Sequence, residues 1–144
     1  MKLIFINGTS VPVPRQYLLK LGRFLKNQLP AKHKKTIHLE LTLVFLNEKK
    51  AKKMNHDYRG KNYATDVLSF DGDGVESLGE LVLCPSVLKK QAKDHGLTYR
   101  EELAYMVIHG MLHLLGYDHE QSQTEARRMF QLQDQLFERY LTSF

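Results

Sequence analysis

The spacing of apolar residues along the chain indicates two kinds of segment. Residues 3–6 form a short β-rich run, and residues 37–45 carry an apolar side chain at every second position, which is the period of a strand. Between residues 14 and 30, leucines recur every three or four positions, which is the period of a helix. The first third of the chain therefore predicts a strand, a helix and a second strand.

Turn and capping residues predict the middle of the chain. Asn47 is suited to cap a lysine-rich helix that continues to about Asp57, after which Arg59 and Gly60 open a loop. Two further strand-like runs, residues 65–70 and 79–84, flank a loop that contains two Asp-Gly pairs, and such pairs signal turns. We expect these two strands to pair in an antiparallel manner.

The C-terminal half of the chain predicts three helices. The first spans about residues 85–96, and each of the next two opens on a capping box, Thr98 with Glu101 and Ser122 with Glu125. The expected order is β-α-β-α-β-β-α-α-α, which is typical of an α+β domain with a mixed sheet of about four strands packed against helices. A chain of 144 residues suits one domain, residues 1–144.

Three histidines at the end of the long apolar helix carry the candidate chemistry. His109 and His113 stand four residues apart, so both imidazoles fall on one helix face. Gly116 permits a turn with positive φ beyond the helix, which can return His119 to the same point. Three neutral imidazoles without a fourth Cys or His nearby in sequence favour a catalytic zinc site with one position open.

Other interpretations of these histidines stay open. They can be ordinary core histidines, although a neutral imidazole on an apolar face needs a partner for its lone pair. Nickel or copper suits three imidazoles as well as zinc does. Asp118 is either a carboxylate that bonds a ligand imidazole or a turn residue. The remaining histidines share no such spacing and are expected on the surface or on strands: His33, His38, His56 and His95.

Gly110 bears on the kind of hydrolase that the site can be. The histidine spacing matches that of the metzincin proteases, in which a Glu general base follows the first histidine, and Gly110 stands at that place here. A metzincin-like metalloprotease is therefore disfavoured but kept as an alternative. We also expect the missing side chain to open the floor of the site to a bulkier ligand such as a phosphodiester.

The charge distribution favours a polyanionic partner. Lys and Arg number 21 against 16 Asp and Glu, which gives a net charge of +5 at pH 7. The basic residues cluster in three stretches, which can also be ordinary solvated helix faces: Lys32, Lys34 and Lys35; Lys49, Lys50, Lys52, Lys53, Arg59 and Lys61; Lys89, Lys90 and Lys93.

Cysteine content and hydropathy bear on the location of the protein. The lone Cys84 cannot form an internal disulfide and is expected in the core, which is compatible with a reducing cytoplasm. No apolar run reaches the length of a membrane span or signal-peptide core, so we expect a soluble intracellular protein.

Four segments of the chain resemble the bacterial YbeY family of rRNA maturation factors, described as single-strand-specific endoribonucleases. They are Leu46-Asn47, Tyr58-Arg59, residues 65–70 and, as the most specific part, residues 109–119. The resemblance implies a zincin-like fold, one zinc ion held by His109, His113 and His119, and Arg59 near the scissile phosphate. It further implies 16S rRNA 3′-end maturation and ribosome quality control in the cytoplasm, with RNA and the ribosomal subunit as partners, ribosomal proteins as further candidates, and no membrane.

The chain departs from the family pattern at two places. Asp71 stands where the family usually has Pro, and Gly79-Glu80-Leu81 replaces a Gly-Asp-Ile strand opening. Both departures lie in or beside the turn-rich loop, so they concern the shape of that loop rather than the metal site.

The role of Arg59 is open at this level. A guanidinium that is always charged can steady the extra negative charge of a pentacovalent phosphate, or it can only anchor a phosphate or form a structural salt bridge. Lysines around positions 49 to 53 are expected to hold the RNA backbone. A non-catalytic ribosome assembly factor that the metal merely stabilises is a second alternative.

Overall fold

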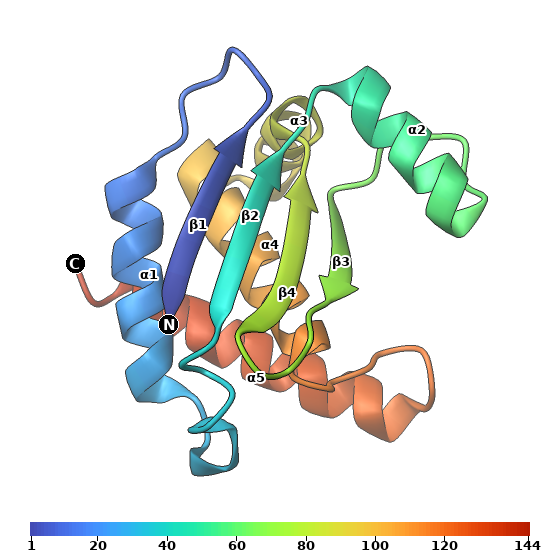
Figure 1. The fold of residues 1–144 in the computed structure, drawn as a ribbon. Helices are drawn as coiled ribbons and strands as arrows, with labels where there is room; N and C mark the ends of the chain where they lie inside the picture. Colours follow the sequence, from blue (N-terminus) through green and yellow to red (C-terminus); the bar gives the residue numbers. More distant parts are fainter.

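A computed structural model describes residues 1–144 and shows one four-stranded sheet in the order β1-β2-β4-β3 (Figure 1). The strands are β1 (Lys2–Asn7), β2 (Glu40–Phe45), β3 (Val67–Asp71) and β4 (Ser77–Leu83). β1, β2 and β4 run parallel, and β3 pairs with β4 in an antiparallel manner at the edge. The mixed sheet and the antiparallel β3–β4 unit are therefore confirmed.

Five helices complete the fold in the expected order. They are α1 (Arg15–Gln28), α2 (Glu48–Arg59), α3 (Pro85–His95), α4 (Tyr99–Leu114) and α5 (Gln123–Leu141), with one additional 3₁₀ helix at Ala31–His33. α4 packs against β3 and β4, and α5 packs across α4 behind the sheet, whereas α2 extends away from the end of β2 (Figure 1). The α+β class is confirmed, and no helix has both the length and the apolar character that crossing a membrane requires.

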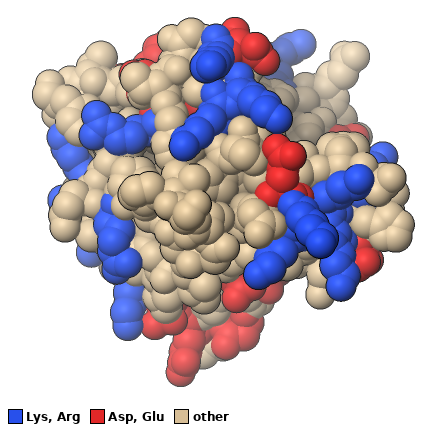
Figure 2. All heavy atoms as spheres, turned by 90° about the horizontal axis from the view of Figure 1, so that it is seen from above, with Lys and Arg blue, Asp and Glu red and all other residues tan.

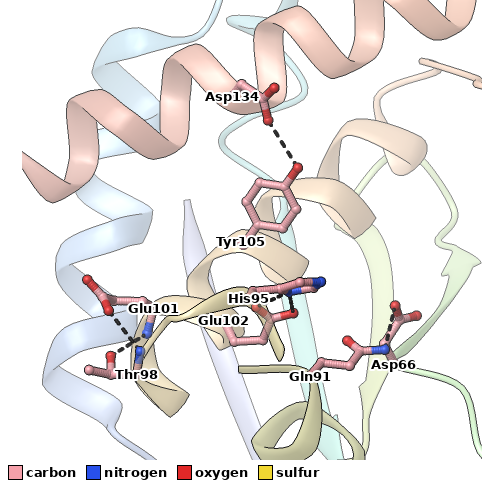
Figure 3. A network of polar contacts seen from close by, with 8 residues as sticks. All are labelled: Asp66, Gln91, His95, Thr98, Glu101, Glu102, Tyr105 and Asp134. Atoms are coloured by element: carbon pink, nitrogen blue, oxygen red, sulfur yellow. Dashed lines mark hydrogen bonds and ion pairs between the residues drawn. The ribbon is translucent and has the colours of Figure 1, made fainter. Parts of the chain in front are cut away.

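Side-chain caps start three of the helices where the sequence indicates. The side chain of Asn47 accepts a hydrogen bond from the backbone N–H of Lys50 at 2.9 Å. At the start of α4, Thr98 and Glu101 form both bonds of the capping box (Figure 3). At the start of α5, the Ser122 hydroxyl accepts from the N–H of Glu125, and the return bond of the box does not form.

Strand boundaries differ from the expected ones by two or three residues. β2 begins at Glu40 rather than at residue 37, because Ile37 lies in a turn. The backbone N–H of Ile37 donates a hydrogen bond to the carbonyl of His33 in this turn. Ile37 is nevertheless 2% exposed, so its place in the alternating pattern reflects burial rather than strand structure. β3 begins at Val67, where the Asp66 carboxylate accepts the backbone N–H of Val67 at 2.7 Å.

The position of α4 determines where the histidines lie. α4 is buried along most of its length because it lies between the sheet and α5, and its core side chains include Leu103, Ile108 and Leu112. Cys84, at the end of β4, is buried in the same interior, as expected. The last two turns of α4 reach the edge formed by β3, and this brings the histidine face of the helix to the surface there.

Candidate metal centre and its cavity

His109 and His113 lie one turn apart on α4 and point to the same place. Their Nε2 atoms are 3.2 Å apart, and the ring centroids are 4.7 Å apart. Two nitrogens bound to one tetrahedral zinc at its usual bond length of about 2.0 to 2.1 Å would be roughly 3.3 Å apart. The helix alone therefore sets two donor atoms at a spacing that suits one metal ion.

The turn after α4 brings His119 back to these two residues. Gly116 adopts φ of 101°, which L-residues avoid, and an added Cβ would meet no atom within 4 Å. Glycine is therefore required here for its backbone conformation rather than for space. The His119 ring centroid lies 4.9 Å from that of His113 and 5.5 Å from that of His109. The three histidines each offer one ring nitrogen, and these nitrogens lie within 4.8 Å of one another.

The chemical state of these side chains fits a bound metal ion. Burial lowers the pKa of both His109 and His113, and neighbouring imidazoles lower it further, so the neutral form that can bind a metal is favoured. Nδ1 of His119 is buried without a hydrogen-bond partner, which is costly unless another group uses it. The three histidines can hold a metal ion, and no Cys, Asp or Glu joins their cluster.

Gln133 of α5 contacts the cluster, and this contact was not predicted from the sequence. Its side chain is 1% exposed, and its Oε1 accepts a hydrogen bond from Nδ1 of His109 at 2.8 Å. A hydrogen on Nδ1 leaves the lone pair on Nε2, the atom that faces His113. The sequence does hold one sign of this role, because Gln133 follows Met129 by four residues. This spacing makes Gln133 a polar residue on the otherwise apolar, buried face of α5.

Two other residues lie close to the cluster. The Phe130 ring lies against His119 and His109, with ring centroids 5.7 Å and 6.3 Å away. Asp118 accepts the backbone N–H of Glu120 at 2.7 Å, so the turn-residue interpretation of Asp118 is the one that the structure supports.

Of the remaining histidines, His33 is buried rather than exposed or on a strand, whereas His95 lies on the surface as expected. His33 is 8% exposed within the 3₁₀ helix, and its Nε2 contacts the Tyr117 hydroxyl at 3.0 Å. His95, at the end of α3, contacts the fully buried carboxylate of Glu102 at 2.9 Å. Both residues have polar partners in the tertiary structure that their spacing in the sequence does not reveal.

Gly110 does not open the floor of the site, so that expectation was wrong. A Cβ on Gly110 would lie 2.7 Å from a methyl group of Leu81 in β4 and 3.3 Å from Val67 in β3. The glycine is therefore required for the close approach of α4 to the sheet. A side chain at this position would be directed against the sheet.

One cavity of about 710 Å³ adjoins the histidine cluster. Its walls come from four parts of the fold: the end of α2, strand β3, the end of α4 and the turn that carries His119. Arg59 lines this cavity together with all three histidines. Its guanidinium forms no ion pair or hydrogen bond with another side chain, so the salt-bridge interpretation of Arg59 is not supported, and the group is free to meet a ligand.

The lysines of α2 form a basic surface on the helix whose last turn borders this cavity. A smaller hollow of about 280 Å³ is lined by Lys49, Lys52, Lys53, His56 and Asn62. We call these five residues the α2 basic patch. Figure 2 shows blue side chains gathered on the side of the molecule where α2 lies, apart from a second basic group at the position of α3. The glycine cap at Gly60, with φ of 68°, ends α2 directly after Arg59, at the rim of the cavity.

The fold and the site together define an α+β protein in which three histidines able to hold one metal ion share an open cavity with an arginine. Residues 6–141 match the family model described as Endoribonuclease YbeY. The chain therefore belongs to the endoribonuclease YbeY family, and it is an enzyme of the RNA-hydrolysing kind, as the resemblance implied.

Individual relatives and a solved structure agree with this assignment. The chain is 52% identical over 143 residues to the Endoribonuclease YbeY of Bdellovibrio bacteriovorus, covering 96% of this chain and 94% of that protein. It is 35% identical over 136 residues to the Endoribonuclease YbeY of Thermosipho melanesiensis, covering 94% of each. The fold is also similar to the solution structure of TM1509 from Thermotoga maritima, with a TM-score of 0.67 and 27% sequence identity. The match covers 98% of this chain and 90% of the TM1509 chain.

Proposed function

We propose that the protein is a zinc-dependent endoribonuclease specific for single-stranded RNA that acts in 16S rRNA 3′-end maturation and ribosome quality control in the cytoplasm. Its partners are then RNA and the ribosomal subunit, with ribosomal proteins as further candidates. One observation carries the proposal: the three histidines and an unpaired Arg59 line the same open cavity on the fold of the YbeY family.

The histidine cluster supplies the metal site in this proposal. His109, His113 and His119 hold the ion through ring nitrogens, and Gln133 keeps the Nδ1 hydrogen of His109 in place. Zinc bound by three imidazoles supplies a water molecule whose pKa is close to 7 and a Lewis acid for a phosphoryl oxygen. The absence of a fourth protein ligand in the cluster supports a catalytic rather than a purely structural ion.

Arg59 and the α2 basic patch bind the negatively charged substrate. The Arg59 guanidinium forms a two-pronged contact with the scissile phosphate and stabilises the additional charge that develops during cleavage. The three lysines of the α2 basic patch lie on the same helix as Arg59 and hold the backbone of the neighbouring nucleotides. Both groups carry positive charge, which suits a substrate with a phosphate backbone.

The metalloprotease alternative has no support at the site. Proteases with this histidine spacing place a general base after the first histidine, and Gly110 here is packed against Leu81 and Val67. The membership of the chain in the endoribonuclease YbeY family also favours RNA over a peptide as the substrate.

The proposal is tested by metal analysis and by RNA cleavage with and without a chelator. We expect about one zinc per chain in the purified protein, cleavage of single-stranded RNA, and loss of cleavage on chelation that added zinc restores. Cleavage that continues in the metal-free protein would contradict the metal dependence, and binding of another ion in place of zinc would correct its identity.

His113→Ala separates this proposal from a non-catalytic assembly factor. A catalytic site predicts loss of RNA cleavage with RNA binding retained, because the α2 basic patch is untouched. A structural site predicts a lower melting temperature and loss of both. His38→Ala is a matched control, since His38 is exposed and outside the cluster, and it should change neither property.

A further inference from the structure

Two aromatic rings form part of the wall of the histidine cavity. Tyr58 lies in the last turn of α2, and Phe70 lies on the edge strand β3. Their ring centroids are 5.2 Å apart with an interplanar angle of 74°, so one ring meets the other edge to face. Both line the same cavity as Arg59 and the three histidines.

The exposure of Tyr58 is not explained by the packing of the fold. The side chain is 69% exposed, although α2 is otherwise rich in lysine and other polar residues. Its hydroxyl has no hydrogen-bond partner in the protein, and Phe70 is the one aromatic ring that it contacts. Most of the ring surface therefore contributes little to stability and is available to a ligand.

The contact with Phe70 fixes the direction of the Tyr58 ring. An edge-to-face pair restricts rotation of an exposed aromatic side chain, so the ring is held ready as a flat surface. A ligand that stacks on it then loses less conformational entropy on binding than with a freely rotating ring. Arg59 follows directly in the sequence and lines the same cavity, so a flat group and a phosphate of one ligand can bind together.

We propose that Tyr58 is a base-stacking subsite, which binds an unpaired nucleobase of the RNA beside the phosphate held by Arg59. The proposal rests on the proposed function and deepens it, because it names a residue that selects single-stranded RNA. The face of a base is available for stacking when the base is unpaired, whereas in a duplex both faces are covered by neighbouring pairs. A stacking ring needs no particular base, so the subsite favours single strands without reading a sequence.

The charge around the rings favours RNA as the occupant. Arg59 lies beside Tyr58, and the α2 basic patch begins within the same helix. A polyanion with flat groups along it matches both the aromatic and the basic features, whereas an apolar protein segment would match the rings alone.

The test uses a short single-stranded RNA with 2′-O-methyl riboses, so that it is not consumed, and one 2-aminopurine base whose fluorescence falls on stacking. The purified protein should quench this fluorescence. Tyr58→Phe should keep the quenching and the affinity, because the ring remains. Tyr58→Ala should lose the quenching and bind at least about fivefold more weakly, the lower end of measured base–aromatic stacking effects. Tyr63→Ala is the matched control, since Tyr63 is 54% exposed nearby but does not line the cavity, and it should behave as the unchanged protein.

A second oligonucleotide with an abasic position in place of 2-aminopurine tests whether the base is what Tyr58 contacts. The unchanged protein should bind it as weakly as Tyr58→Ala binds the normal strand, and Tyr58→Ala should not distinguish the two. In cleavage assays, Tyr58→Ala should lose most of the preference for single-stranded over hairpin RNA while His113→Ala loses cleavage altogether.

The outcomes separate this proposal from the proposed function. If Tyr58→Ala keeps the full quenching and affinity while His113→Ala abolishes cleavage, the stacking subsite is wrong and the nuclease assignment stands. If Tyr58→Ala weakens binding of the normal and abasic strands equally, Tyr58 acts on the backbone or on the fold and the proposal is wrong. If the unchanged protein binds no single-stranded RNA, both proposals fail.

Discussion

Gln133 of α5 accepts a hydrogen bond at 2.8 Å from Nδ1 of His109 in α4. The two residues are 24 positions apart in the sequence, and the bond passes between two helices that pack against each other. Because Gln133 is 1% exposed, no water competes for its carbonyl oxygen. The bond therefore connects the packing of α5 to the orientation and the tautomer of a histidine in the proposed metal site.

Replacing Gln133 by Leu should weaken zinc binding by about 10- to 100-fold, the range measured for lost partners of metal-binding histidines. The leucine leaves the N–H of His109 buried without an acceptor and no longer selects the tautomer with a free lone pair on Nε2. Competition with a chromophoric zinc chelator measures the affinity. Gln135→Leu, at an exposed position of the same helix, is the control, and an equal loss in that variant would show a general effect on α5.

Replacing Gly110 by Ala should lower the free energy of unfolding by about 1 to 2 kcal/mol. The new Cβ would lie 2.7 Å from Leu81, and this overpacking exceeds the gain in helix propensity. Denaturant unfolding measures the change. Gly110→Glu should lower the free energy of unfolding more than Gly110→Ala does, because the carboxylate would be forced against the sheet.

The double variant Gly110→Ala/Leu81→Val provides the control for Gly110. A smaller residue at position 81 makes room for the new Cβ, so the two substitutions together should cost less than the sum of their separate effects. Additive costs would show that the contact with Leu81 is not the cause.

The elements and the histidine cluster could be predicted because their signals are local. The period of the leucines predicts α1, and the four-residue spacing of His109 and His113 with Gly116 beyond them predicts convergence of the imidazoles. These relationships depend on helix geometry and on one turn. Neither needs knowledge of how distant elements pack.

The features that could not be predicted depend on tertiary packing. Gln133 reaches His109 because α5 crosses α4, and Gly110 meets Leu81 because α4 lies against β4. Tyr58 meets Phe70 because α2 ends beside the edge strand. The expected open floor at Gly110 was wrong for the same reason, since the sequence does not show which face of α4 the sheet covers.

The pair of His95 and Glu102 should make stability depend on pH. A hydrogen bond from His95 to the buried carboxylate and the negative charge of Glu102 raise the pKa of His95 above its usual 6.5 (Figure 3). A histidine with a raised pKa in the folded state contributes stability that is fully present below the unfolded value and is lost as pH rises through the folded value. The melting temperature should therefore fall as the pH rises above 6.5. The fall should be small, on the order of 1 to 3 °C, because the imidazole is half exposed and solvent screens its interaction with Glu102.

The variant His95→Gln tests the origin of this pH dependence. Glutamine can donate a hydrogen bond to Glu102 without titrating, so the fall in melting temperature above pH 6.5 should disappear while the fold is retained. The same slope in His95→Gln and in the unchanged protein would assign the pH dependence to another group.

Removing lysines from the α2 basic patch should reduce the salt dependence of RNA binding. Each lysine that contacts a phosphate of single-stranded RNA contributes roughly 0.7 to the slope of log affinity against log salt concentration. Lys52→Gln/Lys53→Gln should therefore lower that slope by about 1.4 and weaken binding at low salt, as measured by fluorescence anisotropy. Lys26→Gln, on the exposed side of α1, should leave the slope unchanged, and a fall of about half that size there would show that net charge alone matters.

Arg59 should affect cleavage more than binding. Removing one group that stabilises developing charge typically lowers kcat by about 10²- to 10³-fold, and we expect a loss of this size for Arg59→Ala. The RNA affinity of this variant should change little, because the α2 basic patch remains. Arg59→Lys keeps the charge without the two-pronged geometry and should recover part of the rate. Single-turnover assays measure the rate constant of the cleavage step apart from product release. Arg139→Ala, an exposed arginine of α5, is the control, and a loss of affinity in Arg59→Ala that matches its loss of rate would show that Arg59 only anchors the substrate.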